Sequence, residues 1–396
     1  MERIILHLDM DYFFAQIEER ENPQFKGKPI VVGADPKEGK GRGVVSTASY
    51  SARKYGIHSA LPISKAYELC PNAIFLPVNM ELYQKVSENI MEIVKKYSPK
   101  WETVSLDEAY LDVSFLKGYK GTKRGATSFP RKGEEGGGGV GVLAEKLKKE
   151  ILEKEKLTCT VGIGPNKLIA KMAAEKAKPR SELCSTTGAK PNGLLIIKPN
   201  QVEKFLEPLD IEDLPGIGPK TAEKLRIIRI NKIKELKKLS KAKLKDIFGV
   251  VGETIYERAR GIDEEEVIPE EIIKSIGKEH TFERDTRDPE IIFKTFDEII
   301  EEIGRGLSSA NFSFKTITVI CRFSGFETHT KSKTEPRPLK MGGAKVKMRM
   351  KSSLPTLKNP TQDFEILKSE SKKLLLKFLI ENPKPIRLIG LRVRIC

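Results

Sequence analysis

Cysteine is scarce in this sequence, with five residues among 396 and none of them in a Cys-x-x-Cys pair. None of the four histidines stands at a zinc-ligand interval from a cysteine. This spacing excludes a zinc ribbon and a small disulfide scaffold. It predicts reduced thiols in a protein of the cytoplasm.

Long hydrophobic runs are also missing. No stretch of about 18 uninterrupted apolar residues occurs, and the N-terminus has no basic segment followed by an apolar one. We therefore expect a soluble, intracellular protein with no membrane partner.

Acidic residues are fewer than basic ones. The chain has 55 Asp and Glu against 71 Lys and Arg, so its formal net charge is +16. An excess of this size favours a polyanionic partner such as nucleic acid over an acidic small molecule. The alternative is a basic protein whose charge serves solubility alone.

The chain is too long for one ordinary domain, because one domain per ~150 residues predicts two to four. Residues 3–10 are apolar and β-branched, whereas residues 12–21 and 80–97 repeat apolar residues at the helical period. Alternating strand and helix signals of this kind predict an α/β or α+β layer within a multidomain protein.

The second half of the chain is organised differently. Residues 200–261 show only helical patterns, and residues 275–396 mix strands with helices as a separate α+β domain. Between them, the acidic segment 263–271 has the composition of an exposed linker. The Gly-rich stretch 118–141 has too few apolar residues to bury much surface, so we expect a loop that interrupts one domain.

Four carboxylates stand near the ends of expected strands. Asp9 and Asp11 share one face of the first strand if it alternates regularly. The adjacent Asp107 and Glu108 can reach one site only if a turn falls there. Hard cations such as Mg²⁺ take carboxylate oxygens, which suits phosphoryl or nucleotidyl transfer. The alternative is that the second pair is solvated and that Asp11 caps the following helix.

Five segments, taken in order, resemble one family. They are LDMDYFFAQIEE, TASYSARKYGI, SLDEAYLDVS, TVGIGPNKLIAKMAAEKAKP and LPGIGPKTAEKL. Together they are similar to the Y-family DNA polymerases of the DinB or DNA polymerase IV type, bacterial and archaeal. The resemblance is close over residues 3–275 and loose beyond.

The resemblance implies a right-hand polymerase with palm, fingers, helical thumb and a C-terminal α+β little finger. The implied domains are a palm at 1–21 and 80–176, fingers at 22–79, a thumb with a helix-hairpin-helix at 177–261, a linker at 262–274 and a little finger at 275–396. The loop at 118–141 is longer than the family pattern, so its path in the palm stays open.

The resemblance also implies the metal site. Asp9, Asp107 and Glu108 would be the catalytic metal ligands for two Mg²⁺ ions, and the carbonyl of Met10 would help to hold the second ion. Asp11 matches a position that is not usually a ligand. The resemblance therefore makes Asp11 a structural residue, although alternation alone would treat it like Asp9.

Contacts to the incoming nucleotide follow from the same motifs. Tyr50 and Arg53 lie three apart near the start of a helix, where backbone amides favour phosphate, and the resemblance places both on the triphosphate. It adds Lys167 as a third, cationic contact.

Three consecutive aromatic residues complete the implied nucleotide site. Tyr12 would lie near the triphosphate, Phe13 would pack inward, and Phe14 would be the steric gate whose ring collides with a ribose 2′-hydroxyl. Without the family, all three would be assigned to the core.

Two segments are expected to contact the DNA backbone. LPGIGPKTAEKL resembles a helix-hairpin-helix motif in which Gly216 and Gly218 form the turn and Lys220 adds charge. In the last domain, KVKMRMK alternates basic with apolar residues, as a half-buried strand facing phosphates does. Its basic residues are Lys345, Lys347 and Arg349.

The sequence therefore predicts a template-dependent DNA polymerase that extends a primer with dNTPs, with the low fidelity of translesion synthesis implied by the family. We expect a monomer on primer-template DNA. A sliding clamp stays open as a partner, because no tail follows RLIGLRVRIC. The alternatives are a catalytically inactive DNA-binding scaffold with a polymerase-like fold and another two-metal enzyme, such as a nucleotidyl cyclase.

Overall fold

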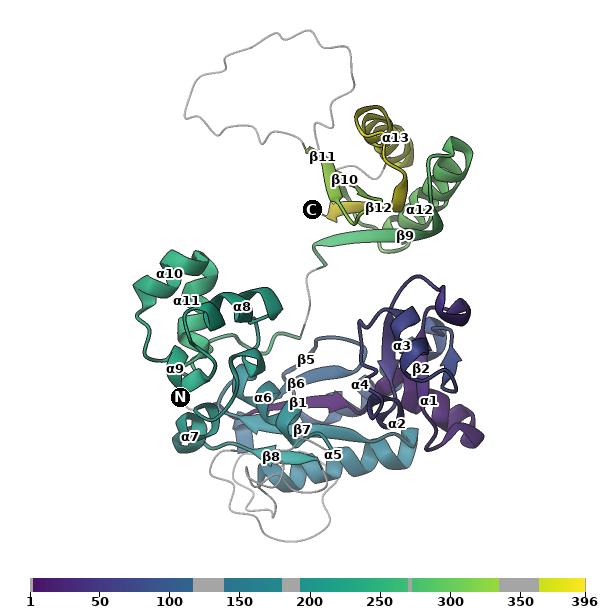
Figure 1. Ribbon diagram of the computed structural model, residues 1–396. Coiled ribbons are helices and arrows are strands. Elements are labelled where there is room, and N and C mark those ends of the chain that lie inside the picture. Colours follow the sequence, from purple (N-terminus) through teal and green to yellow (C-terminus); the bar gives the residue numbers. More distant parts are fainter. Residues whose placement is uncertain (1–2, 117–138, 180–192, 270–272, 335–362, 396) are drawn as a thin grey trace. The chain divides into compact units, whose positions relative to one another are not determined.

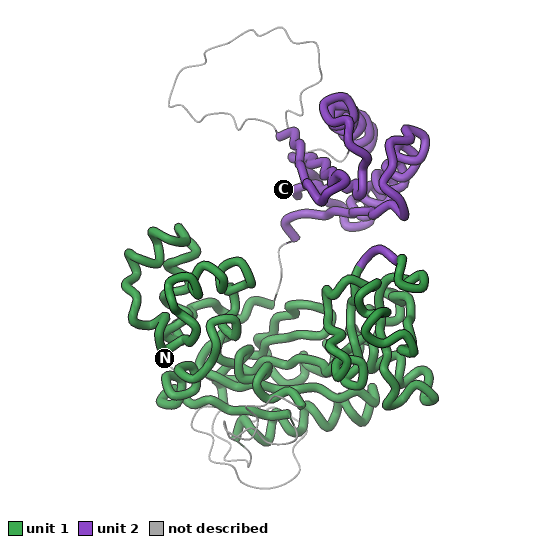
Figure 2. Tube along the Cα trace, viewed as in Figure 1, with its two compact units in different colours: residues 1–40, 44–271 green, residues 41–43, 272–396 purple. Residues whose placement is uncertain are grey.

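The computed structural model describes residues 3–116, 139–179, 193–269, 273–334 and 363–395. These residues form two compact units, one of residues 1–40 and 44–271 and the other of residues 41–43 and 272–396 (Figure 2). The basic segment with Lys345, Lys347 and Arg349 lies outside the described residues, as does most of the Gly-rich stretch. Within the described part, no helix is long and apolar enough to cross a membrane.

A five-stranded sheet forms the centre of the first unit, in the order β5-β6-β1-β7-β8 (Figure 1). The strands β1 and β7 are buried at every residue, so apolar side chains lie on both faces of the sheet, and the polar residues His7, Asp9 and Thr160 are buried among them. The strands are β1 (Ile5–Met10), β5 (Trp101–Thr103), β6 (Glu108–Asp112), β7 (Cys159–Gly164) and β8 (Leu194–Ile196).

Helices pack against this sheet. The helices α4 (Met80–Val94) and α5 (Val140–Glu155) share a core with Leu6 and Leu8 of β1. The helix α6 (Lys167–Ala177) packs on β7 so closely that a Cβ at Gly162 would lie 2.1 Å from the carbonyl oxygen of Ala170. The strand expected at 3–10 and the helix expected at 80–97 are confirmed, the latter with its last turn a 3₁₀ helix.

A smaller three-stranded sheet, in the order β3-β2-β4, has a core of its own. The helix α1 (Phe13–Glu21) connects β1 to this part and confirms the helix expected at 12–21. Ser49 caps α2 by accepting a hydrogen bond from the backbone of Ala52. The elements are β2 (Ile30–Gly33), β3 (Val45–Ala48), β4 (Ile74–Leu76), α2 (Tyr50–Arg53) and α3 (Ile63–Leu69).

Short helices, packed around a third hydrophobic core, complete the first unit. The helical pattern of residues 200–261 predicts them. Gly216 has φ +94°, a left-handed conformation that favours glycine, and Gly218 is the N-cap of α8. These helices are α7 (Val202–Leu206), α8 (Pro219–Ile227), α9 (Ile233–Leu236), α10 (Lys241–Phe248) and α11 (Val250–Arg258).

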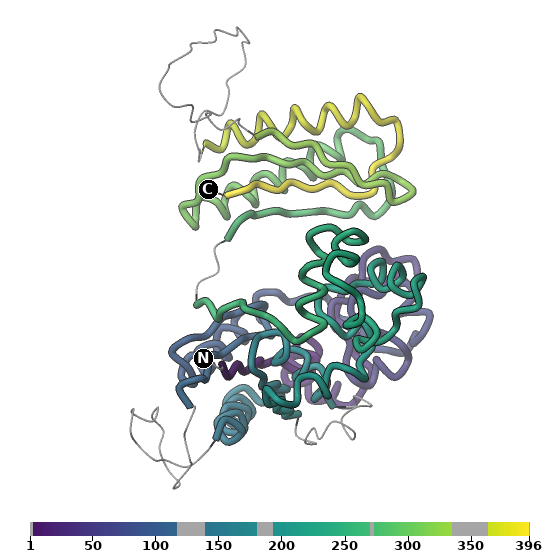
Figure 3. The backbone as a smooth tube through the Cα atoms, turned by 90° about the vertical axis from the view of Figure 1, so that its left-hand side faces the viewer, coloured from purple at the N-terminus to yellow at the C-terminus, as the bar shows by residue number. Residues whose placement is uncertain are grey.

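The second unit is a four-stranded antiparallel sheet, in the order β11-β10-β12-β9, with two helices packed on it (Figure 3). The mixed strand and helix pattern expected for this part of the chain is confirmed. The elements are β9 (Ser275–Thr286), α12 (Pro289–Ser309), β10 (Phe314–Phe323), β11 (Thr328–Thr334), α13 (Phe364–Glu381) and β12 (Ile386–Ile395).

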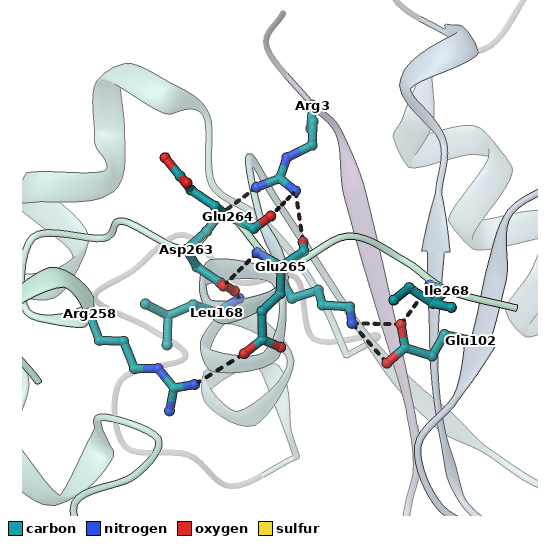
Figure 4. A network of polar contacts seen from close by, with 9 residues as sticks. Arg3, Glu102, Leu168, Arg258, Asp263, Glu264, Glu265 and Ile268 are labelled. Atoms are coloured by element: carbon teal, nitrogen blue, oxygen red, sulfur yellow. Dashed lines mark hydrogen bonds and ion pairs between the residues drawn. The ribbon is translucent and has the colours of Figure 1, made fainter. Parts of the chain in front are cut away.

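The acidic segment after α11 is not a free linker. Glu264, Glu265 and Glu266 are exposed as expected. However, Arg3 donates hydrogen bonds to the carbonyl oxygens of residues 263–265 at 2.5 to 3.3 Å (Figure 4). The carboxylate of Asp263 accepts from the backbone of Leu168 at 2.9 Å and so satisfies a free N–H in the first turn of α6. Val267 is buried. Residues 262–268 are therefore anchored along the first unit.

Candidate active site

A pocket of about 200 Å³ lies where β1 ends, between the two sheets of the first unit. Carboxylates, tyrosines and cations converge there from segments far apart in the sequence. The lining residues are Asp9, Met10, Tyr12, Phe13, Ser46, Thr47, Tyr50, Arg53, Ser59, Asp107, Glu108 and Lys178.

Strand register brings the three predicted metal ligands together. Asp9 is the Cα partner of Glu108 in the β1–β6 ladder, and the backbone N–H of Met10 donates to the carbonyl oxygen of Asp107 at 2.9 Å. The strand β5 ends at Thr103 and β6 begins at Glu108, so the turn that the sequence required is present. Asp107 lies in that turn and Glu108 opens the next strand.

Two lysines contact these carboxylates. The Nζ atom of Lys178 lies 3.0 Å from Oδ2 of Asp9, and the Nζ atom of Lys171 lies 2.5 Å from Oε2 of Glu108. Nε2 of the fully buried His7 lies 3.4 Å from the same oxygen of Glu108. Glu108 is thus paired with a lysine of α6, and Asp9 with the lysine that follows this helix.

Burial and these contacts shift the pKa values of Asp9 and Glu108 in opposite directions. Burial raises the pKa of Asp9 to about 7, although Lys178 opposes the shift. Burial would also raise the pKa of Glu108, but the contacts from His7 and Lys171 outweigh it and hold that pKa at about 2. Burial lowers the pKa of His7, so its imidazole is neutral at neutral pH.

The donor chemistry of this pocket fits Mg²⁺. Three carboxylates and a backbone carbonyl are hard oxygen ligands, and they line one cavity with room left for water and phosphate. In the described part of the chain, no three acidic, histidine or cysteine side chains are already arranged to hold a metal ion. A metal ion would therefore have to replace the lysine contacts to Asp9 and Glu108.

The predicted phosphate contacts from α2 lie at the same pocket. Tyr50 and Arg53 both line it, and the Arg53 guanidinium lies 5.4 Å from the centre of the Tyr50 ring. The rings of Tyr12 and Tyr50 are 4.6 Å apart. Burial raises the pKa of Tyr50, so its hydroxyl stays protonated. The pocket thus has a cation and two tyrosine side chains beside the carboxylates.

Phe13 and Phe14 are placed differently. Phe13 is buried, as expected, and also reaches the pocket lining. The described lining does not include Phe14, which is half-buried and stacks on Tyr83 with ring centres 4.2 Å apart and planes inclined by 15°. Tyr83 in turn donates a hydrogen bond to Glu18 at 2.6 Å.

The structure does not bring Lys167 to this pocket. Its ammonium group is 2.6 Å from Glu102, its side chain is 9% exposed, and Glu102 also accepts from the backbone of Ile268 in the anchored segment. Lys167 begins α6, which has 11 residues and is therefore about 16 Å long, whereas Lys178 follows its end. The pocket cation that the sequence analysis missed is Lys178, the penultimate residue of the same quoted motif.

Asp11 is buried and is not part of the described lining. Its carboxylate accepts hydrogen bonds from the hydroxyls of Thr158, Thr160 and Tyr50 at 2.6, 2.8 and 3.3 Å. The alternative in which Asp11 caps the following helix is wrong, since Tyr12 is the N-cap of α1 and no side chain caps it. Regular alternation fails for Asp11 because β1 ends at Met10.

The predicted helix-hairpin-helix turn is at the surface of the first unit. Gly216, Gly218 and Lys220 are exposed, and the turn is held by a hydrogen bond from Arg258 to the carbonyl oxygen of Pro215 at 3.0 Å. The backbone at the start of α8 is therefore accessible to a ligand.

Carboxylates at the end of a buried strand, facing cations that suit a polyphosphate, form the arrangement used by nucleic-acid polymerases. Three family models match the chain. They are the impB/mucB/samB family at residues 8–175, the DNA polymerase-iota thumb domain at 212–263 and the impB/mucB/samB family C-terminal domain at 273–394.

Similar curated proteins and solved structures agree with these matches. DNA polymerase IV of Methanoculleus marisnigri is 40% identical, over 99% of this chain and 94% of its own. DNA polymerase IV 2 of Methanosarcina mazei is 42% identical, over 84% of this chain and 82% of its own. A Y-family chimera of Dbh and Dpo4 is 32% identical with a TM-score of 0.77, covering 99% of this chain and 98% of that one.

This chain belongs to the Y family of DNA polymerases and is a homologue of DNA polymerase IV, the DinB type. It is accordingly a DNA-directed DNA polymerase of translesion synthesis, a family that generally uses a divalent metal. The fold expected from the sequence, α+β with a helical thumb and a C-terminal little finger, is confirmed.

Proposed function

We propose that this polymerase adds dNTPs to a primer 3′ end with two Mg²⁺ ions bound at the pocket beyond β1. The convergence of Asp9, Asp107 and Glu108 on one cavity supports the proposal. These carboxylates and the carbonyl of Met10 would hold the ions. Bound there, the ions would lower the pKa of the primer hydroxyl and stabilise the leaving pyrophosphate.

The side chains around the carboxylates would bind and orient the nucleotide. Arg53, Tyr12 and Tyr50 line the space where a triphosphate would lie next to the acids. The two tyrosine hydroxyls would have to leave Glu19 and Asp11 to contact it. Lys178 now neutralises Asp9, and we propose that it turns to the triphosphate when the carboxylate takes a metal ligand's role. The ion pair of the buried Lys167 with Glu102 favours Lys178 over Lys167 as this contact.

The ring of Phe14 would select the sugar. Its stacking on Tyr83 fixes one face of the ring, so the side chain has a rigid support from which to exclude a 2′-hydroxyl. This support favours the steric-gate role that the resemblance implies.

Primer-template DNA is the proposed macromolecular partner. The net charge of +16, the exposed turn at Gly216 and Gly218, and the basic residue Lys220 support backbone contacts, to which Lys345, Lys347 and Arg349 would add. One of the similar solved structures, 31% identical with a TM-score of 0.59, is described as an insertion ternary complex of Dbh DNA polymerase. We further propose a low-fidelity monomer acting in the cytoplasm, with a sliding clamp as an open question.

Primer extension tests this function directly. The wild-type chain, a labelled primer-template, four dNTPs and Mg²⁺ should give extension that Asp107→Ala abolishes. Glu92→Ala, which removes an exposed acid of α4, is the matched control and should behave as wild type. Extension that survives Asp107→Ala would overturn the metal assignment. DNA binding without any extension by the wild-type chain would favour the inactive scaffold.

A further inference from the structure

The two lysines that contact the metal-ligand carboxylates come from one helix segment. Lys171 lies in α6 and Lys178 immediately follows its last residue, Ala177. Seven residues are close to two helical turns, so both side chains leave the same side of the helix, about 10 Å apart along its axis. They meet Glu108 and Asp9, which are cross-strand partners.

The helix that carries these lysines is held rigidly against the sheet. The approach of α6 to Gly162 leaves no space for a side chain, since a Cβ there would lie 2.1 Å from the backbone of both Ala170 and Ala174. Its first turn is tied down by Asn166, whose side chain accepts from Ile169, and by Asp263. The backbone of Lys171 is therefore held in place, and its side chain extends from there to Glu108.

Lys171 differs from Lys178 in what surrounds it. Lys178 lines the nucleotide pocket, whereas Lys171 is outside the described lining and contacts Glu108 from the α6 side, beside the buried His7. Its side chain is 37% exposed, so an ammonium group displaced from Glu108 can move into water at little cost. Lys171 is thus suited to compete with a cation for Glu108.

We propose that Lys171 is a positioning residue for metal binding. Its ammonium group occupies Glu108 in the metal-free enzyme, keeps that carboxylate extended at the edge of the pocket and lowers the affinity of the empty site for a divalent cation. The inference rests on the proposed function, in which Glu108 is a metal ligand. It concerns how tightly the site binds metal before nucleotide and DNA arrive, which the family assignment leaves open.

Titration of the full chain with Mn²⁺, followed by electron paramagnetic resonance without DNA or nucleotide, tests the proposal. Lys171→Met should lower the dissociation constant about tenfold, the factor expected for losing one competing, partly exposed ion pair and its repulsion of the cation. Lys171→Arg keeps the charge and should bind Mn²⁺ as the wild type does. Lys176→Met is the matched control, because Lys176 lies on the same helix and pairs with Asp213 at 2.7 Å.

The outcomes separate this inference from the proposed function. If Asp107→Ala weakens Mn²⁺ binding but Lys171→Met leaves the affinity unchanged or reduced, the role of Lys171 is refuted and the metal site stands. If Asp107→Ala has no effect on Mn²⁺ binding, the cation does not bind in this pocket and both are refuted. Thermal unfolding of each variant checks that the fold is intact.

Discussion

Asp9 and Asp11 should respond in opposite ways to the same isosteric change, aspartate to asparagine. Both carboxylates are buried, and they stand two residues apart. Asp9 lies in the candidate metal site, where burial raises its pKa from 3.8 to about 7. Asp11 is surrounded by hydroxyl donors. Since asparagine keeps the shape of the side chain, the comparison isolates charge and hydrogen bonding.

The magnitude for Asp9 follows from its pKa. A folded-state pKa above the unfolded value means that the ionised carboxylate destabilises the fold at a pH above 7, and that this cost disappears as the pH falls below 3.8. At about 1.4 kcal/mol per pKa unit, the cost is roughly 4 kcal/mol. Asp9→Asn also removes one partner of Lys178, which keeps Glu175 at 2.6 Å. We therefore expect a net gain of about 1–2 kcal/mol at pH 8.

For Asp11 the same change removes an acceptor. The amide nitrogen of asparagine cannot accept the hydrogen bond that the exposed Thr158 donates to the buried carboxylate, so this charge-assisted bond is lost. The expected cost is about 1–3 kcal/mol. Asp11→Asn should thus lower the stability that Asp9→Asn raises.

Thermal unfolding at pH 8 without divalent metal measures both changes, at about 2 °C in Tm per kcal/mol. In primer extension with Mg²⁺, we expect the order of the two variants to be reversed, with Asp9→Asn the more damaged. Asp9→Asn should lose roughly 1,000-fold in rate, because a lost metal ligand removes several kcal/mol of charge stabilisation, whereas Asp11→Asn should stay within about tenfold of wild type. Equal loss of Tm in both variants, or equal loss of activity, would refute the distinction between the two aspartates.

Three further predictions concern other parts of the first unit. Phe14→Ala should admit ribonucleotides in primer extension, and unchanged sugar discrimination would remove its gate role. Lys178→Met should raise KM for dNTPs about tenfold, because it removes one charge-assisted contact to the nucleotide. Lys167→Met should lower Tm and leave KM unaltered. A raised KM in Lys167→Met with an unaltered KM in Lys178→Met would contradict the assignment of Lys178 to the pocket. Arg3→Ala should speed cleavage within residues 262–268 by the glutamate-specific protease Glu-C about tenfold, and an unchanged rate would show that the anchor is not needed.

Much of the fold was predictable from local patterns. A mostly apolar composition fits β1 and β7 because both are buried on two faces, with His7, Asp9 and Thr160 as buried polar exceptions. Helical periodicity fits α4 because one side of it packs on the sheet. The strand β9 was not predicted, since most of its residues are exposed and polar. It is a strand because β12 supplies its hydrogen-bond partners, and that information is not local.

The acidic segment after α11 is a second case in which the local sequence does not predict the contacts of the backbone. Its charge and its proline indicate an exposed linker, and the side chains of Glu264, Glu265 and Glu266 are indeed exposed. Its backbone is nevertheless held by Arg3, which stands 260 residues away in the chain from Asp263. Composition describes the side chains of such a segment, whereas the partners of its backbone are set by tertiary structure.

The sequence by itself determined the motifs: the carboxylates at Asp9, Asp107 and Glu108, the Tyr50–Arg53 pair and the glycines of the helix-hairpin-helix turn. Each motif is a short local segment, and the resemblance of five such segments in order to one family suffices to assign their roles as expectations. Only the tertiary structure decided which lysine lines the pocket and that the carboxylate of Asp11 accepts hydrogen bonds from hydroxyl groups. Both depend on where α6 crosses the sheet and where β1 ends, and these positions come from packing between segments more than 100 residues apart.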